Sequence, residues 1–244
     1  MSTMTIRSVT LSEESSQAWK RANCYFPKRE RTPNEMLDLY VTNESDFILN
    51  LGNTEFDPSD EDLESREIDA QCVFNIGRNI RPLVRPGSTR VLLGEMVPPY
   101  PLPSSVFTIE YWIKAPGAKG KGKTLVQGHE LPQIPNDWDL QVHIKGAEYR
   151  VITVDDSVVQ VSARHGENND RSYEWVGVTD SPRAVKQAAK NAARKLEGRN
   201  VIGWDIILDN EKAYILEGNS CPGMNEATAK RILDRMRGRT YEDA

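Results

Sequence analysis

The sequence contains few cysteines and few histidines. Its 244 residues include three cysteines, Cys24, Cys72 and Cys221, which form no CxxC pair, and three histidines without metal-binding spacing. An odd number of widely spaced thiols gives no disulfide framework and favours a reducing compartment, so we expect a cytoplasmic protein. Without paired histidines or cysteines, the sequence offers no ordinary zinc site.

Long apolar runs and an excess of positive charge are also absent. No stretch of about 18 apolar residues occurs, so we expect no membrane-spanning helix. Residues 1–14 are polar and lack the apolar segment of a secretory signal. The net charge of −5 argues against dedicated nucleic-acid binding. The chain is long enough to bury the core of one large or two small domains.

A hairpin pattern stands out near the C-terminus. Two strand-like segments, 203–207 and 215–219, are joined by a polar segment rich in turn-forming residues. Pairing of these strands brings Asp205 beside Glu217. Asn219 lies two residues after Glu217, and alternate residues of a strand point to the same face. The sequence therefore predicts that the three polar side chains lie together.

Two carboxylates and an amide oxygen on one face form a set of hard oxygen ligands. Mg²⁺ prefers such ligands and completes its coordination with substrate phosphates, and Mn²⁺ accepts the same ligands. The alternative is that Asp205 and Glu217 are ordinary surface charges of a hairpin. Against it, Trp204, Ile206 and Leu216 flank them, and a carboxylate among apolar residues is costly unless it is paired or metal-bound.

The order of these residues resembles a known motif. Asp205, Glu217-x-Asn219 and the following Pro222-Gly223 match the metal-binding segment D(x)nExNxxPG of ATP-grasp enzymes. The resemblance implies that Asp205, Glu217 and Asn219 hold Mg²⁺ together with ATP. Pro222-Gly223 forces a turn directly after the last of them.

A second hairpin is expected upstream, with strands 148–154 and 158–164. Arg150 lies near the start of the first strand and Arg164 ends the second, so antiparallel pairing brings both guanidinium groups to the same end. Guanidinium groups suit phosphate oxygens, which their planar fork binds at two points. The alternative is a pair of unrelated surface arginines.

Residues 146–151 are similar to the G-x-(D/E)-x-R-V element of ATP-grasp ligases. The resemblance implies that Glu148 approaches the ribose and Arg150 the phosphates. Arg164 matches the arginine that ends the following strand in those enzymes. We therefore expect Arg150 and Arg164 to act in catalysis.

A shorter strand-like segment, 109–116, contains Lys114 and precedes a loop at 117–124 with three glycines and three lysines. Glycines let backbone amides approach phosphates, although a flexible basic linker is an equal alternative. The GxxxxGK[ST] spacing of a Walker A loop is absent. In the ATP-grasp arrangement Lys114 matches the nucleotide-contacting lysine, and Lys121 of the loop ranks below it.

Segment 140–146 resembles the strand between the two ATP-grasp lobes, whose backbone binds adenine. The resemblance implies adenine contacts for Gln141, His143 and Ile144. Many relatives carry an acidic and an aromatic residue where Val142 and His143 stand, so only the backbone contact carries over. A packing or surface role is the alternative for His143.

The first hundred residues contain two strand-like segments, 46–51 and 72–77, separated by an acidic loop or helix at 57–67. These elements resemble the small α/β domain of phage-type ATP-grasp carboxylate–amine ligases. In such proteins a lysine often opens the helix before the ATP-grasp lobe. Here segment 86–93 offers Arg90 instead, which is a candidate phosphate contact.

A helix is expected between the two hairpins. Its apolar stripe runs from Ala184 to Leu196, Ser181 is the expected cap, Pro182 suits the first helical position, and Gly198 follows the end. Its lysines and arginines favour a solvated face over phosphate binding. After the last hairpin, the charged segment 230–244 predicts either a closing helix or a frayed tail.

Together these patterns indicate an α/β (α+β) protein, and the resemblance implies the ATP-grasp fold, whose two lobes clamp ATP. We expect a lead-in domain at 1–100 and an ATP-grasp domain at 101–244, with lobes at about 101–143 and 144–244. The resemblance implies an ADP-forming ligase that joins a small-molecule or peptide carboxylate to an amine through an acyl phosphate. The alternatives are a kinase or other phosphotransferase, and a non-catalytic nucleotide-binding protein. A homodimer is possible, since dimers are common among small enzymes. If a phage encodes the protein, we expect it in the cytoplasm of the host cell.

Overall fold

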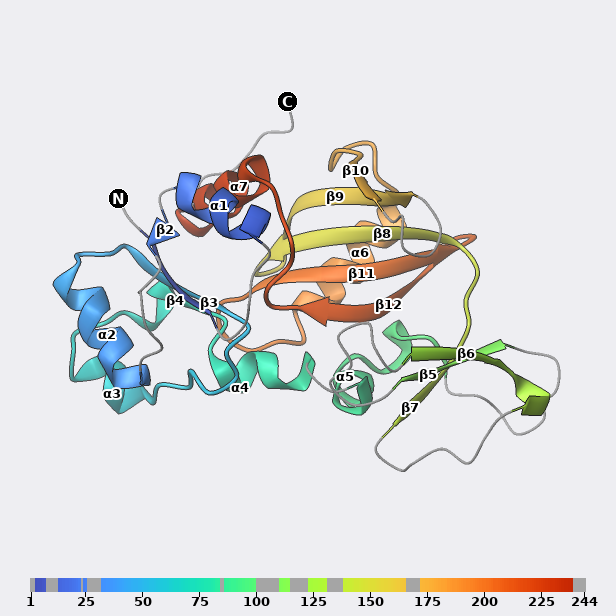
Figure 1. Ribbon diagram of the computed structural model, residues 1–244, viewed down its shortest axis with the longest axis horizontal. Coiled ribbons are helices and arrows are strands. Elements are labelled where there is room, and N and C mark those ends of the chain that lie inside the picture. Colours follow the sequence, from blue (N-terminus) through green and yellow to red (C-terminus); the bar gives the residue numbers. More distant parts are fainter. Residues whose placement is uncertain are drawn as a thin grey trace.

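The structure is a computed structural model that describes residues 3–7, 13–22, 24–25, 32–83, 86–99, 110–114, 123–130, 138–165 and 172–238. It contains three β-sheets, each built from one continuous part of the chain (Figure 1). Within the described residues, no helix has both the length and the apolar character needed to cross a membrane.

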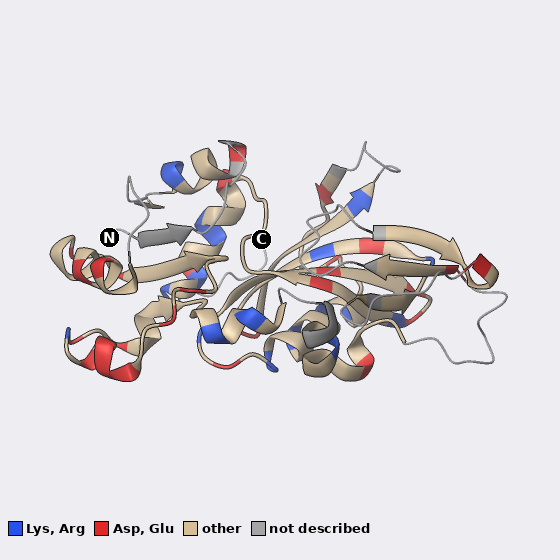
Figure 2. Cartoon of the chain, turned by 60° about the horizontal axis from the view of Figure 1, so that its bottom comes forward, with Lys and Arg blue, Asp and Glu red and all other residues tan. Residues whose placement is uncertain are grey.

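The N-terminal sheet is parallel and has the strand order β2-β1-β3-β4. Its strands and the helices between them are β1 (Thr3–Arg7), α1 (Glu13–Arg21), β2 (Cys24–Tyr25), α2 (Pro33–Thr42), β3 (Phe47–Leu51), α3 (Asp60–Glu64) and β4 (Val73–Phe74). The strands expected at 46–51 and 72–77 are confirmed, the second in shortened form. The acidic segment between them contains α3, which a capping box at Ser59 and Asp62 begins and which is red in Figure 2.

Short helices lead from this sheet to the next. They are the 3₁₀ helix η1 (Ala70–Cys72), α4 (Gly77–Ile80), η2 (Arg81–Leu83), α5 (Pro86–Leu93) and η3 (Gly94–Met96). The second sheet is antiparallel and comprises β5 (Glu110–Lys114), β6 (Lys123–Gln127) and β7 (Asp139–Val142), with β5 in the middle and η5 (Gly128–Glu130) after β6. Tyr111, Ile113 and Leu140 form its own small core.

The third sheet has five antiparallel strands in the order β10-β9-β8-β11-β12. They are β8 (Ala147–Val154), β9 (Ser157–His165), β10 (Ser172–Trp175), β11 (Val201–Asp209) and β12 (Lys212–Asn219). Both expected hairpins are confirmed. Their tight turns use Asp155 and Asn210 at φ values of 52° and 53°, a left-handed conformation that Asp and Asn adopt more readily than most residues.

Helix α6 (Arg183–Ala193) covers one face of this sheet (Figure 1). Its stripe of buried residues, Val185, Ala188, Ala189, Ala192 and Ala193, packs against Val151, Val161, Trp204 and Ile206 of the strands. The helix was expected, but its cap was wrong. Pro182 is the N-cap, and its carbonyl accepts from the N–H of Lys186 at 3.3 Å. Ser181 is buried, and its hydroxyl donates to the carbonyl of Val178 at 2.7 Å. The Ser181 side chain therefore stabilises the preceding segment and does not cap the helix.

Helix α7 (Glu226–Met236) begins at the side-chain cap Asn225 and covers part of the opposite face. It packs beside α1 and closes a core that contains residues of both the N-terminal and the five-stranded sheets (Figure 1). That shared core includes Trp19, Leu49, Phe74, Ile152, Val201, Ile232 and Leu233. Of the two outcomes expected for 230–244, the closing helix is correct as far as Met236, and residues 239–244 lie outside the described part. The division at residue 100 stays a prediction.

Two asparagine side chains, neither with any exposed surface, join the N-terminal sheet to the five-stranded sheet. Asn75 accepts the N–H of Val201 at 2.8 Å and donates to the carbonyls of Val201 and Ser220 at 3.1 and 3.3 Å. The side-chain amide of Asn50 donates to the backbone carbonyl of Asn75 at 2.7 Å. The side-chain amide of Asn75 in turn donates to the backbone carbonyl of Asn50 at 2.9 Å. The start of β11 and the end of β12 are therefore held from one point.

Candidate active site

One row of residues crosses all five strands of the third sheet. Trp175 pairs with Ser162, Ser162 with Arg150, Arg150 with Asp205, and Asp205 with Glu217. Directly paired residues share a face of a sheet, so the row lies on the face opposite α6. The hairpin prediction that Asp205 lies beside Glu217 is confirmed by this register.

Arg150 and Asp205 form an ion pair in the middle of the row. Arg150 donates from Nε to Oδ1 at 2.8 Å and from a terminal nitrogen to Oδ2 at 2.9 Å. The exposed fractions of the two side chains are 22% and 16%, so the pair is mostly shielded from water. Burial raises the pKa of Asp205, Arg150 opposes this shift, and the negative charge of Glu217 raises the pKa further. Two carboxylates this close favour a cation between them.

Glu217 and Asn219 lie on the same face of β12, as expected. The amide of Asn219 donates to Oε1 of Glu217 at 3.4 Å. Asn219 pairs with Gly203, where a Cβ would come within 2.6 Å of Pro222. Pro222 therefore packs in the space left by the missing side chain, which holds the segment after β12 against the end of the sheet. The chain bends at Ser220 and Cys221, just before the Pro222-Gly223 turn that the sequence predicted.

The oxygen atoms of these three side chains suit a hard divalent cation, although Asp205 is also bound by Arg150. Asp205, Glu217 and Asn219 offer oxygen ligands from adjacent strands, as Mg²⁺ requires. No group of three or more His, Cys, Asp or Glu side chains suited to a metal occurs in the described part of the chain, so such a site depends on the amide oxygen. A bound cation would also share Asp205 with Arg150.

Arg164 pairs with Glu148, the residue two positions before Arg150. The ring of Tyr173 lies 4.3 Å from the guanidinium carbon of Arg150, and it sits directly opposite Arg164 in the sheet. Partial burial and then the charge of Asp205 raise the pKa of the Tyr173 hydroxyl. Arg150 and Arg164 therefore do lie on one face, but each already holds a carboxylate, and Tyr173 lies beside both.

The link between β7 and β8 carries a polar cluster around Glu110. Its Oε2 lies 3.0 Å from Nδ1 of His143 and 3.1 Å from Nζ of Lys145. The N–H of His143 donates to the carbonyl of Glu110 at 2.8 Å, so this backbone donor is already used. Gly146 approaches β11 so closely that a Cβ would come within 2.1 Å of the carbonyl oxygen of Leu208.

The other expected nucleotide contacts are scattered around that link. Gln141 is buried in β7, and Ile144 is half-buried just after it. Arg90 of α5 donates to the carbonyls of Pro98 and Leu140 at 2.8 and 3.4 Å, which ties α5 to β7. Lys114 ends β5, but its side chain is outside the described atoms, and Lys121 lies outside the described residues altogether.

Two features of this face were not anticipated from the sequence. Strand β10 and its Tyr173 were not singled out, although Tyr173 and Trp175 alternate as the aromatic residues of a strand do. The partner of Arg150 was also missed, because the pairing of β8 with β11 joins residues 55 positions apart. The only local signal was the aromatic alternation.

The fold of the chain is similar to that of solved structures that include ATP-grasp proteins. A D-alanine–D-alanine ligase from Bacillus anthracis in complex with ATP superposes with a TM-score of 0.63 at 13% identity, over 98% of this chain and 97% of that one. The ATP-grasp ligase PsnB with its minimal precursor gives 0.64 at 15% identity, over 98% and 100%. A RimK-domain ATP-grasp protein from Sphaerobacter thermophilus gives 0.58 at 14% identity, over 96% and 98%.

Sequence comparison adds one curated relative. A protein of Haemophilus ducreyi named "Probable alpha-L-glutamate ligase" is 33% identical over 101 residues, which are 39% of this chain and 33% of that protein. The match therefore spans about a third of the relative's length. No protein-family model matches the chain. The mixed α/β architecture and its structural neighbours show that the chain has the ATP-grasp fold, as the sequence predicted.

Proposed function

We propose that this chain is an ATP-dependent ligase that joins a carboxylate to an amine and releases ADP and phosphate. The observation that carries the proposal is the row of Arg150, Asp205 and Glu217 on the face of the five-stranded sheet opposite α6. The fold, and the names of the neighbours and of the curated relative, support it. The phage-type subgroup and the cytoplasmic location belong to the same proposal.

In this proposal Asp205, Glu217 and Asn219 hold Mg²⁺, which would neutralise charge on the phosphates of ATP. Glu148 contacts the ribose, and the 141–144 segment receives the adenine through Gln141, His143 and Ile144. Three further basic residues, Lys114, Lys121 and Arg90, are assigned to the phosphates. Because Arg90 holds two backbone carbonyls, it would have to exchange these bonds or contact phosphate with its remaining donors.

The reaction then has two steps. A carboxylate oxygen of the first substrate attacks the γ-phosphorus of ATP, the bond to the β-phosphate oxygen breaks, and ADP leaves. Arg150 and Arg164 stabilise the negative charge that builds up on the phosphoryl oxygens. The amine of the second substrate then attacks the acyl carbon, forms the C–N bond and displaces phosphate, with loss of a proton from nitrogen.

The first experiment is thermal unfolding with ATP, in the presence and absence of Mg²⁺. Ligand at about a hundred times its Kd adds roughly 2.7 kcal/mol of stability, so wild type should show an increase in Tm that requires Mg²⁺. Glu217→Gln should lose this increase. Glu211→Gln is the matched control, because Glu211 is exposed in the turn of the same hairpin.

An equal increase in wild type and Glu217→Gln would contradict the metal assignment. Where the shift is present, release of ADP is measured with carboxylates and amines, beginning with glutamate and short peptides. A product with a new C–N bond and free phosphate supports the ligase. A stable phosphorylated product would identify a phosphotransferase instead.

A further inference from the structure

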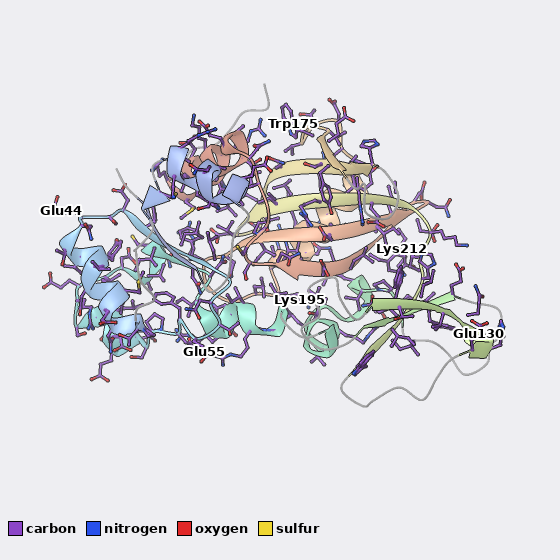
Figure 3. The ribbon with its side chains drawn as sticks, in the orientation of Figure 1. Glu44, Glu55, Glu130, Trp175, Lys195 and Lys212 are labelled. Atoms are coloured by element: carbon purple, nitrogen blue, oxygen red, sulfur yellow. The ribbon has the colours of Figure 1, made fainter. Side chains whose placement is uncertain are left out.

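Strand β10 is an edge strand with unusually exposed aromatic side chains. It pairs with β9 on one side and ends the sheet on the other. Tyr173 is 39% exposed and Trp175 54% exposed. Edge strands are usually protected by charged residues or proline, and exposed aromatic residues there often serve binding. Figure 3 shows Trp175 between β10 and α7.

Trp175 is connected to the candidate active site by the row described above. Between it and Asp205 lie only Ser162 and Arg150, each on the next strand. Strands are spaced by about 4.8 Å, so the backbones of Trp175 and Asp205 are separated by about 14 Å across one face. An extended peptide of about four residues covers that distance, whereas a single amino acid does not.

Arg231 of α7 completes this end of the row. Its guanidinium carbon lies 4.4 Å from the centre of the Trp175 ring, in cation–π contact. Within the described residues no carboxylate pairs with Arg231, whereas Arg150 and Arg164 on the same face both hold carboxylates. An arginine on an exposed tryptophan thus offers both an unused positive charge and an apolar surface.

We propose that Trp175 and Arg231 form a subsite for an acidic peptide, which is the carboxylate substrate. Arg231 binds one side-chain carboxylate of the peptide, and Trp175 packs against the aliphatic part of the same side chain. The reacting carboxylate of the same peptide lies at the other end of this span of about four residues, beside Arg150 and Asp205. This assignment rests on the proposed ligase function, because that function supplies the reason for the second carboxylate.

The subsite is tested by calorimetric titration with an acetylated tetraglutamate peptide and with its neutral tetraglutamine counterpart. Wild type should bind tetraglutamate and discriminate against tetraglutamine. Arg231→Gln should weaken tetraglutamate binding about tenfold, the effect of losing roughly one charge-assisted contact. Trp175→Ala should weaken it by about the same factor, because the apolar packing of the glutamate side chain and the support of Arg231 are both lost. Arg183→Gln is the matched control, because Arg183 is an exposed arginine of α6, on the other side of the sheet.

The outcomes separate the subsite from the proposed function. Equal affinity of wild type and Arg231→Gln for tetraglutamate, no binding by wild type, or equal binding of both peptides would each overturn the subsite. The Mg·ATP increase in Tm should be unchanged in Arg231→Gln and Trp175→Ala. Its absence from wild type would overturn the ligase proposal, while the peptide titration would still decide the subsite.

Discussion

Arg150 binds both carboxylate oxygens of Asp205 across two neighbouring strands, while Glu217 faces Asp205 from the third. A single carboxylate is therefore held between a positive and a negative group. The sheet fixes this geometry, because all three residues belong to one row of paired positions. Any cation that binds here meets a ligand that is already oriented.

Asp205→Asn should destabilise the protein and remove its response to Mg²⁺. Breaking a fully buried ion pair costs about 3–5 kcal/mol, and partial exposure of this pair reduces the expected loss to about 1–3 kcal/mol. Urea unfolding without ligand measures the loss, and thermal unfolding with Mg·ATP measures the response. Asp209→Asn, at the end of the same strand, is the control and should retain both properties. A Mg²⁺ response retained by Asp205→Asn would argue against this residue as a ligand.

Arg164→Ala should leave ATP binding nearly intact and slow phosphoryl transfer by about a hundredfold, as expected for a group that acts on developing charge. The variant also releases Glu148, which is one-third exposed and can be rehydrated, so stability should change little. Single-turnover ADP formation and ATP affinity are measured side by side. Equal losses in affinity and rate would instead assign Arg164 to ground-state binding.

Asn75→Gly should destabilise the protein by about 2–3 kcal/mol, because the N–H and C=O of Val201 and the carbonyl of Ser220 would each lose a buried partner. Asn75 has a φ of 61°, a conformation that suits glycine, so the change removes the amide without straining the backbone. Urea unfolding at constant m-value provides the measurement. A Gly variant as stable as wild type would show that the backbone conformation alone is needed at this position.

Glu110→Gln should make the protein less sensitive to acid. The hydrogen bond from His143, and then that from Lys145, lowers the pKa of Glu110. A carboxylate with a lowered pKa in the folded state adds stability above its unfolded pKa, and this contribution is lost as pH falls through the folded value. Between pH 7 and pH 3, Tm should therefore fall further in wild type than in Glu110→Gln. Glu130→Gln, exposed after β6, is the control, and parallel curves for all three proteins would contradict the prediction.

Local sequence was sufficient to predict both hairpins of the five-stranded sheet. Their turns are marked by residues such as Asp155 and Asn210, and the period of two in a strand determines which residues share a face. For that reason Asp205, Glu217 and Asn219 could be grouped before their positions were known. The same local information failed at Ser181, whose hydroxyl donates to the carbonyl of Val178 in the preceding turn, so that the helix begins at Pro182 without a side-chain cap.

The remaining features depend on contacts between distant parts of the chain. Arg150 was identified as a phosphate-binding candidate, but its pairing with Asp205 requires the order of β8 and β11 in the sheet. The hydrogen bond between Asn75 and Val201 links residues 126 positions apart, and nothing near Asn75 in the sequence indicates Val201 as its partner. Such pairings follow from the whole topology rather than from the pattern of any segment.

The separate core of the small sheet has a consequence for how the protein unfolds. Tyr111, Ile113 and Leu140 pack among themselves, whereas the N-terminal and five-stranded sheets share the core that α7 closes. The two larger sheets should therefore melt as one cooperative unit, and the small sheet should exchange its amide hydrogens earlier. Gly146, which no larger residue can replace without meeting the carbonyl of Leu208, marks the boundary between the two behaviours.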